Sequence, residues 1–300
     1  DFVNMPVASF NEIEIIRFAG AAQIGTFTGA QLTGEVIDLT ETVAGTSNLI
    51  INVAAGQTQT FANITASTFT SGTDVITING STGNETITGP SNVATSINGG
   101  DGNDTINGGS AVDIISGGNG NDTIDGGAGA DALTGGQGND VYLYNTGDAA
   151  TGETITEIAG QGTDVIAIVT STDFVNMPVA SFNEIEIIRF AGAAQIGTFT
   201  GAQLTGEVID LTETVAGTSN LIINVAAGQT QTFANITAST FTSGTDVITI
   251  NGSTGNETIT GPSNVATSIN GGDGNDTING GSAVDIISGG NGNDTIDGGA

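Results

Sequence analysis

The stretch GGDGNDTINGGSAVDIISGGNGNDTIDGGAGADALTGGQGNDVYL, residues 99–143, divides into five nonapeptides in strict register. Each begins with two glycines, carries Asp at its sixth position and has a large apolar residue at its eighth. Glycines at positions one, two and four permit a tight turn with positive φ angles and leave the backbone carbonyls accessible. The apolar residue then points inward from a short strand. Each nonapeptide is therefore predicted to form a turn followed by a strand.

The sixth position places a carboxylate in every predicted turn, and the eighth places a core residue in every predicted strand. The carboxylates are Asp104, Asp113, Asp122, Asp131 and Asp140, and the core residues are Ile106, Ile115, Ile124, Leu133 and Tyr142. Carboxylate and carbonyl oxygens suit hard cations, Ca²⁺ above all. Zinc and copper prefer His and Cys, which are absent from the chain. The turns are therefore predicted to bind calcium.

These nonapeptides resemble the RTX repeat, G-G-x-G-x-D-x-U-x, in which U is a large apolar residue. The resemblance implies a parallel β-roll in which two nonapeptides form one coil, and turns 18 residues apart stack at a spacing of about 4.8 Å with Ca²⁺ between them. At least three sites per full unit are expected, with Asp122 between Asp104 and Asp140 on one edge and Asp113 beside Asp131 on the other. The residues expected to form these sites are Gly99, Gly100, Gly102, Asp104, Gly108, Asp113, Gly117, Gly118, Gly120, Asp122, Gly126, Gly129, Asp131, Gly135, Gly138, Asp140, Gly271, Gly274, Asp276, Asp285, Gly289, Gly292 and Asp294.

Departures from the repeat occur inside and around this block. Ala111 stands where the fourth-position glycine belongs, which weakens the site expected between the turns of Asp113 and Asp131. Upstream, the segment GSTGNETIT at 80–88 has Glu85 in place of Asp, and this residue is a candidate entry ligand beside Asp104. The fragments SGTDVIT at 71–77 and GQGTDVIA at 160–167 look like isolated repeats, whose aspartates are expected to be surface or turn residues.

A far longer repeat contains the nonapeptides. Residues 1–128 and 173–300 are identical, and the period is 172 residues. Before the nonapeptides, β-branched stretches predict strands at 13–18, 35–39, 48–53 and 74–78, and no long helix is expected. The chain is thus predicted to be all-β, a parallel β-roll or solenoid flanked by further β-rich segments in a tandem array. The expected division is a β-rich segment at 1–78, a calcium-binding β-roll at 79–143, a second β-rich segment at 144–250 and a second, truncated roll at 251–300.

The charge of the chain supports a bound metal. There are 32 acidic residues against two Arg, and the net charge is −30. Because clustered or buried carboxylates must be protonated, paired or placed on a metal, calcium is the expected counter-charge at neutral pH, and the roll is expected to be disordered without it. Nucleic acid and anionic lipid are poor partners for such a surface, and no hydrophobic run approaches the length of a membrane span.

Long identical repeats favour a structural role over catalysis. The chain has no His, Cys or Lys, so no catalytic triad, zinc site or Schiff base can be built, and an enzyme is not expected. The predicted function is a calcium-stabilised structural module of a secreted bacterial surface layer, sheath or extracellular filament. The expected partners are identical chains, with cell-surface polysaccharide as a further candidate. The alternative is the stalk of a giant adhesin, which the same sequence features would fit.

Overall fold

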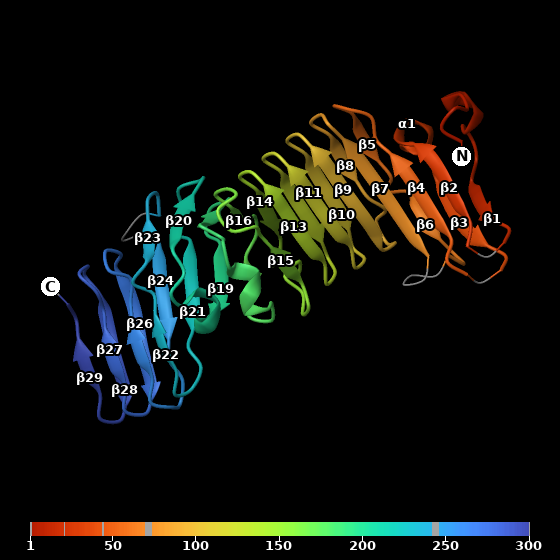
Figure 1. Ribbon diagram of the computed structural model, residues 1–300. Helices are drawn as coiled ribbons and strands as arrows, with labels where there is room; N and C mark the ends of the chain where they lie inside the picture. The colour runs from red at the N-terminus through yellow and green to blue at the C-terminus, as the bar shows by residue number, and fades with distance from the viewer. Residues whose placement is uncertain (1, 21, 44, 70–73, 242–245, 300) are drawn as a thin grey trace. The chain divides into compact units, whose positions relative to one another are not determined.

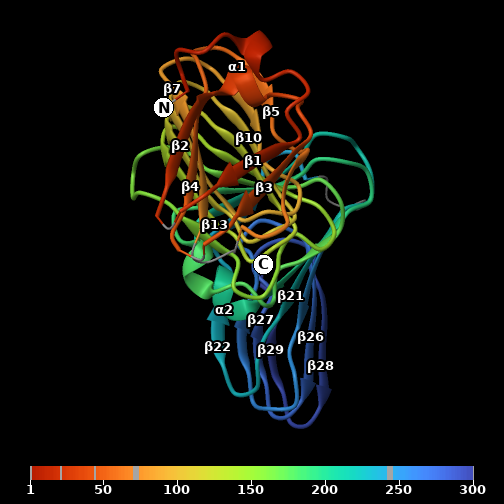
Figure 2. The ribbon, with the colours of Figure 1, turned by 90° about the vertical axis from the view of Figure 1, so that its right-hand side faces the viewer.

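The computed structural model describes all residues except 1, 21, 44, 70–73, 242–245 and 300. The chain divides into two compact units, one formed by residues 1–142 with 152–162 and the other by residues 143–151 with 163–300. Strands dominate both units (Figure 1 and Figure 2). The described helices are the short α1 (Gly29–Leu32), α2 (Gly201–Leu204), η1 (Val7–Ser9) and η2 (Val179–Phe182), and none of them is long and apolar enough to cross a membrane.

The first unit is built from short strands that stack along the chain. They are β1 (Ile15–Phe18), β2 (Ile24–Thr28), β3 (Ile37–Glu41), β4 (Asn48–Asn52), β5 (Thr58–Thr60), β6 (Ile64–Ala66), β7 (Val75–Ser81), β8 (Thr86–Thr88), β9 (Thr95–Asp101), β10 (Thr105–Gly109), β11 (Ile114–Asn119), β12 (Thr123–Gly127), β13 (Ala132–Gln137) and β15 (Thr154–Thr156). Two sheets run along the nonapeptide region, one with the order β15-β13-β11-β9-β7-β4-β2 and the other containing β12-β10-β8-β5. The order β1-β3-β6 forms a third sheet.

The second unit repeats this pattern. Its strands are β16 (Val165–Ile168), β17 (Thr172–Asp173), β18 (Ile187–Phe190), β19 (Ile196–Thr200), β20 (Ile209–Glu213), β21 (Asn220–Asn224), β22 (Thr230–Thr232), β23 (Ile236–Ala238), β24 (Val247–Asn251), β25 (Thr258–Thr260), β26 (Thr267–Asp273), β27 (Thr277–Asn279), β28 (Ile286–Asn291) and β29 (Thr295–Asp297). The strand β14 (Val141–Tyr144) contains the boundary between the units. The sheet orders β17-β19-β21-β24-β26-β28 and β22-β25-β27-β29 follow the chain in the same way as in the first unit.

The nonapeptides form a parallel roll with the expected register. Ile106 of β10 pairs with Ile124 of β12, and Ile115 of β11 pairs with Leu133 of β13. Backbone-to-carboxylate bonds between successive turns span 18 residues, which confirms that two nonapeptides complete one coil. The five predicted core residues are at most 1 % exposed. Because each coil is only one strand thick along the roll, its apolar side chains are covered by the next coil, and the roll is stable only as a stack.

The segments before the nonapeptides form larger coils of the same parallel kind. The strands predicted at 13–18, 35–39, 48–53 and 74–78 correspond to β1, β3, β4 and β7, and β4 pairs with β7 in parallel. The side chain of Asn79 donates to that of Asn52, 27 residues earlier, so the coil here is half as long again as in the roll. Between Glu85 and Asp104 the step falls to 19 residues. The four-part division of the chain at 78, 143 and 250 remains a proposal about its folding segments.

Candidate metal centres

The sixth-position aspartates form two ladders along the edges of the roll. The backbone N–H of Asp104 donates to Oδ1 of Asp122 at 2.7 Å, and the N–H of Asp122 donates to Oδ1 of Asp140 at 2.8 Å. On the other edge the N–H of Asp113 donates to Oδ1 of Asp131 at 2.7 Å. The structure therefore brings together the three pairs expected from the sequence. In each pair, one carboxylate oxygen is used to hold the neighbouring coil.

The second carboxylate oxygen faces the first glycine of its own turn. In Asp104, Asp113 and Asp122 this Oδ2 is buried and accepts no hydrogen bond from any residue that the structure describes. A Cβ built on Gly99 would lie 2.3 Å from Oδ2 of Asp104 and 2.5 Å from the carbonyl oxygen of Gly117 in the next coil. Carboxylate and carbonyl oxygens thus converge on a space that only glycine leaves open. A buried anionic oxygen without a donor, beside a carbonyl, fits a hard cation.

The glycines of a turn have two different functions. Gly100 and Gly102, at positions two and four, have φ angles of 109° and 116°, which disfavour any residue with a side chain. Gly99 at position one is not among the residues with positive φ, so the expectation of positive φ at all three positions is wrong there. Position one instead requires glycine for space, because its Cβ would contact the carboxylate.

Ala111 does not interrupt the Asp113 ladder. It is not among the residues with positive φ, unlike Gly102 in the preceding nonapeptide, so the turn follows a different path. Asp113 and Asp131 are nevertheless 0 % exposed, and they keep the backbone-to-carboxylate bond between them. The substitution therefore changes the local turn but leaves both carboxylates in place.

Burial without a basic partner raises the pKa of these carboxylates. Burial is the largest cause that raises the pKa of Asp113 to about 7, the charge of Asp131 adds to it, and the hydrogen bond from the Thr95 backbone opposes it. Burial likewise raises the pKa of Asp122 to about 7, and it also raises the pKa of Asp104 and Asp140. The fold therefore holds its charged carboxylates poorly unless a proton or a cation neutralises them.

The second copy, residues 173–300, repeats this arrangement wherever the coil that stacks on a turn lies within the chain. The N–H of Asp276 donates to Oδ1 of Asp294 at 3.0 Å, and the N–H of Thr267 donates to Oδ1 of Asp285 at 2.8 Å. A Cβ on Gly271 would meet Oδ2 of Asp276 at 2.5 Å and the Gly289 carbonyl at 2.4 Å. Asp276 is buried, whereas Asp285 and Asp294 are partly exposed.

The sequence singles out three acidic residues beside the nonapeptides. Asp74 and Asp164 are expected at the surface or in turns; they are 5 % and 3 % exposed, so the surface alternative is wrong, and they lie directly before β7 and β16. Glu85 accepts the backbone N–H of Gly56 at 2.7 Å with Oε1 and that of Ser81 at 2.8 Å with Oε2. Backbone donors therefore contact both of its oxygens, and its role as an entry ligand beside Asp104 stays a prediction.

One ladder member was missed by sequence reasoning. The backbone N–H of Asp131 donates to Oε2 of Glu153 at 2.8 Å, 22 residues later. Glu153 lies in the segment GETITE, which lacks the double glycine and the nonapeptide spacing. A glutamate directly before the β-branched stretch that forms β15 is the signal in the sequence that could have identified it.

Comparison with known proteins identifies the turns. A family model of the RTX calcium-binding nonapeptide repeat matches residues 96–115, 108–142 and 268–300. The chain contains RTX calcium-binding repeats. Neither the curated proteins nor the solved structures contain a match to the chain. Calcium is therefore the ion that these RTX turns bind, and the ladders of buried carboxylates agree with it.

Proposed function

We propose that the chain is a calcium-stabilised structural module of a secreted bacterial surface layer, sheath or extracellular filament. The supporting observation is that two identical stretches form coils with the same register. Ser96 pairs with Ile114 in the first copy, and Ser268 pairs with Ile286 in the second. A parallel coil that pairs through both of its edges can be extended by further coils without a new interface. Such a module gains length with each copy, which suits a structural polymer.

Within each RTX roll, we propose that calcium is held by the sixth-position carboxylates together with turn carbonyls and the glycines that leave room for them. The residues proposed are those expected from the sequence at 99–140 and 271–294. The bound ion would neutralise the buried carboxylates that the chain cannot pair with basic residues. The protein itself positions these carboxylates, because Oδ1 of Asp122 and of Asp140 accepts a backbone N–H from the preceding coil and thereby orients Oδ2.

The proposed location follows from the strength of such sites. Extracellular calcium modules bind with Kd values of about 10⁻⁴ to 10⁻³ M, so they fill at millimolar calcium and stay empty in the cytosol. We therefore propose export of an unfolded chain that folds outside the cell. The proposed partners are identical chains, with cell-surface polysaccharide as a further candidate, and no catalytic activity is proposed for the segment.

Calcium titration of the full 300-residue chain tests this proposal. Far-UV circular dichroism should show a gain of β-structure with CaCl₂ that EGTA reverses, and light scattering should show calcium-dependent growth of fibres or sheets. Folding without growth would favour the stalk of an adhesin instead. Complete folding of the RTX rolls in EGTA would refute the calcium-dependent mechanism.

A further inference from the structure

A second cluster of carboxylates lies outside the RTX turns, at a corner of the long coils. In the second copy it contains Glu213 at the end of β20 and Asp246 directly before β24. Ser219, which directly precedes β21 and is 0 % exposed, contacts Asp246. The backbone N–H of Ser219 donates to Oδ1 of Asp246 at 2.9 Å, 27 residues later. Asp246 thus accepts the backbone of the preceding coil in the same way as the sixth-position aspartates of the RTX roll.

Two side-chain oxygens at this corner, one from Glu213 and one from Ser219, have no donor among the described residues. Oε2 of Glu213 and Oγ of Ser219 are both buried, and neither has a hydrogen-bond partner in the part of the chain that the structure describes. Burial raises the pKa of Glu213, and the charge of Asp246 raises it further, so the two carboxylates lie close enough to repel each other. A buried anionic oxygen beside a second carboxylate requires a cation or a proton.

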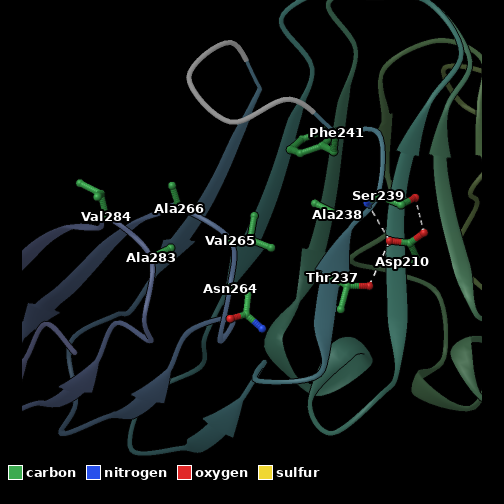
Figure 3. Close-up of a pocket in the computed structure, with 10 residues that line it drawn as sticks. All are labelled: Asp210, Thr237, Ala238, Ser239, Phe241, Asn264, Val265, Ala266, Ala283 and Val284. Carbon is green, nitrogen blue, oxygen red and sulfur yellow. Dashed lines mark hydrogen bonds between the residues drawn. The ribbon is translucent and has the colours of Figure 1, made fainter. Parts of the chain in front are cut away.

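A neighbouring aspartate on the same strand shows that the lack of a hydrogen-bond donor is specific to Glu213. Asp210 of β20 accepts hydrogen bonds from the backbone N–H of Ser239 at 2.9 Å and from the hydroxyls of Ser239 and Thr237 at 2.5 and 3.0 Å (Figure 3). It lies beside an open pocket of about 650 Å³, and its hydrogen bonds come from the next coil. The fold therefore supplies donors to the half-buried carboxylate of Asp210, whereas none of the described residues donates to the buried Oε2 of Glu213.

The first copy builds the same corner from its own residues. The backbone N–H of Ser47 donates to Oδ1 of Asp74 at 2.8 Å, and the hydroxyl of Ser47 donates to Oε2 of Glu41 at 3.3 Å. One serine therefore contacts both carboxylates directly. This contact shows that the serine hydroxyl points toward the glutamate, and its length shows that the hydroxyl satisfies the carboxylate only weakly.

We propose that Glu213, Ser219 and Asp246 form a calcium site of a second class, outside the nonapeptide turns. The first copy contains the equivalent site, formed by Glu41, Ser47 and Asp74. Two carboxylates and one hydroxyl are the oxygen ligands that Ca²⁺ accepts, and water completes its six to eight ligands. The ion would connect two consecutive long coils, so that calcium also stabilises the segments between the RTX rolls.

Ion counting on the full chain tests this site. In the double variant Glu41→Gln with Glu213→Gln, equilibrium dialysis against CaCl₂ should detect two fewer bound ions per chain at saturation. The matched control is Glu12→Gln with Glu184→Gln, which makes the same change of charge at two exposed glutamates and should keep the wild-type count. An unchanged count in the Glu41 and Glu213 variant would overturn the proposal, while the ions of the RTX turns serve as the internal reference.

Diffraction provides a second readout that does not depend on how the variant folds. Crystals of the wild-type chain grown in CaCl₂ should show anomalous peaks at about 2.3–2.6 Å from the carboxylate oxygens of Glu213 and Asp246. Peaks in the RTX turns without a peak at this corner would refute the second class of site. A complete absence of peaks would instead refute calcium binding by the whole chain, so the two failures are distinguishable.

Discussion

Replacement of Asp122 by Asn should have opposite effects on stability in the presence and absence of calcium. In the structure, Oδ1 of Asp122 accepts the backbone N–H of Asp104, and an Asn side chain retains this acceptor. Oδ2 of Asp122 is buried without a donor, so the charge there is useful only when a cation binds it. The variant should therefore bind calcium more weakly, and without calcium it should be more stable than the wild type.

The size of the stabilisation follows from the pKa. Burial raises the pKa of Asp122 from 3.8 to about 7, so above pH 7 the charged group opposes folding. The difference corresponds to about 4 kcal/mol at most, at about 1.36 kcal/mol per pH unit. Solvent screening reduces this to about 2 kcal/mol. At pH 8 in EGTA, the folding equilibrium of the roll should therefore be about 2 kcal/mol more favourable for Asp122→Asn than for the wild type, and at saturating calcium the free energy of unfolding should be lower than that of the wild type.

Tyrosine fluorescence can measure both signs, as the folded fraction in EGTA and as the urea midpoint at saturating calcium. The only two tyrosines of the chain, Tyr142 and Tyr144, are buried at the end of the first RTX roll and report on it. The control is Asp101→Asn, which removes an exposed carboxylate one coil away and should change stability little under either condition. Destabilisation of Asp122→Asn by the same amount in calcium and in EGTA would refute the role of Oδ2 as a metal ligand.

Three further predictions concern the same roll. In EGTA, acidification from pH 8 to pH 5 should increase the β signal in circular dichroism. The pKa of Asp113 and Asp122 lies near 7 in the folded roll and near 3.8 in the unfolded chain, so their charge opposes folding above pH 7 and protonation removes that cost. A β signal that falls on acidification would contradict this. Gly117→Ala should lower the free energy of unfolding by about 2–3 kcal/mol and weaken calcium binding, because its Cβ would lie 2.2 Å from Oδ2 of Asp122. In the control Gly20→Ala, the Cβ meets only the flexible side chain of Gln23 at 3.3 Å. Equal losses of stability for the two variants in calorimetry would argue against steric exclusion. Tyr142→Phe should lower the unfolding free energy by about 2 kcal/mol, because it removes the hydroxyl that donates to the Glu157 carboxylate, and an unchanged urea midpoint would show that this bond contributes nothing.

The RTX roll could be predicted from the sequence because its spacing determines its contacts. A period of nine residues places Ile106 and Ile124 in the core and, two turns later, stacks Asp104 on Asp122. Each of these contacts depends only on the sequence spacing between the two residues, so no long-range information is needed. The position-one glycines were assigned the wrong role for the same reason. Their function depends on the carboxylate of their own turn, which the pattern alone does not place.

The long coils were predicted only as strands. Stretches such as NLIINV at 48–53 specify a strand but neither its partner nor its direction, and the 27-residue step contains no repeated motif. The buried state of Asp74 was missed because an isolated SGTDVIT fragment lacks the stacked neighbours that make a nonapeptide recognisable. In the structure, the neighbour is Ser47 in the preceding long coil, which no local pattern reveals.

Glu85 lies at the junction between the long coils and the RTX roll, where we expect the need for bound metal to begin. Its backbone N–H donates to Oδ1 of Asp104 like any member of the ladder, yet its own two oxygens are satisfied by the N–H groups of Gly56 and Ser81. Glu257 in the second copy accepts equivalent bonds, from Gly228 and from Ser253. A side chain one methylene longer than Asp can reach both donors, so both carboxylate oxygens at the junction between long and short coils have a backbone donor. We therefore expect the removal of calcium to act first on the coils that follow this glutamate. There, Oδ1 of Asp104 and of Asp122 accepts one backbone N–H from the preceding coil, while the buried Oδ2 has no donor among the described residues.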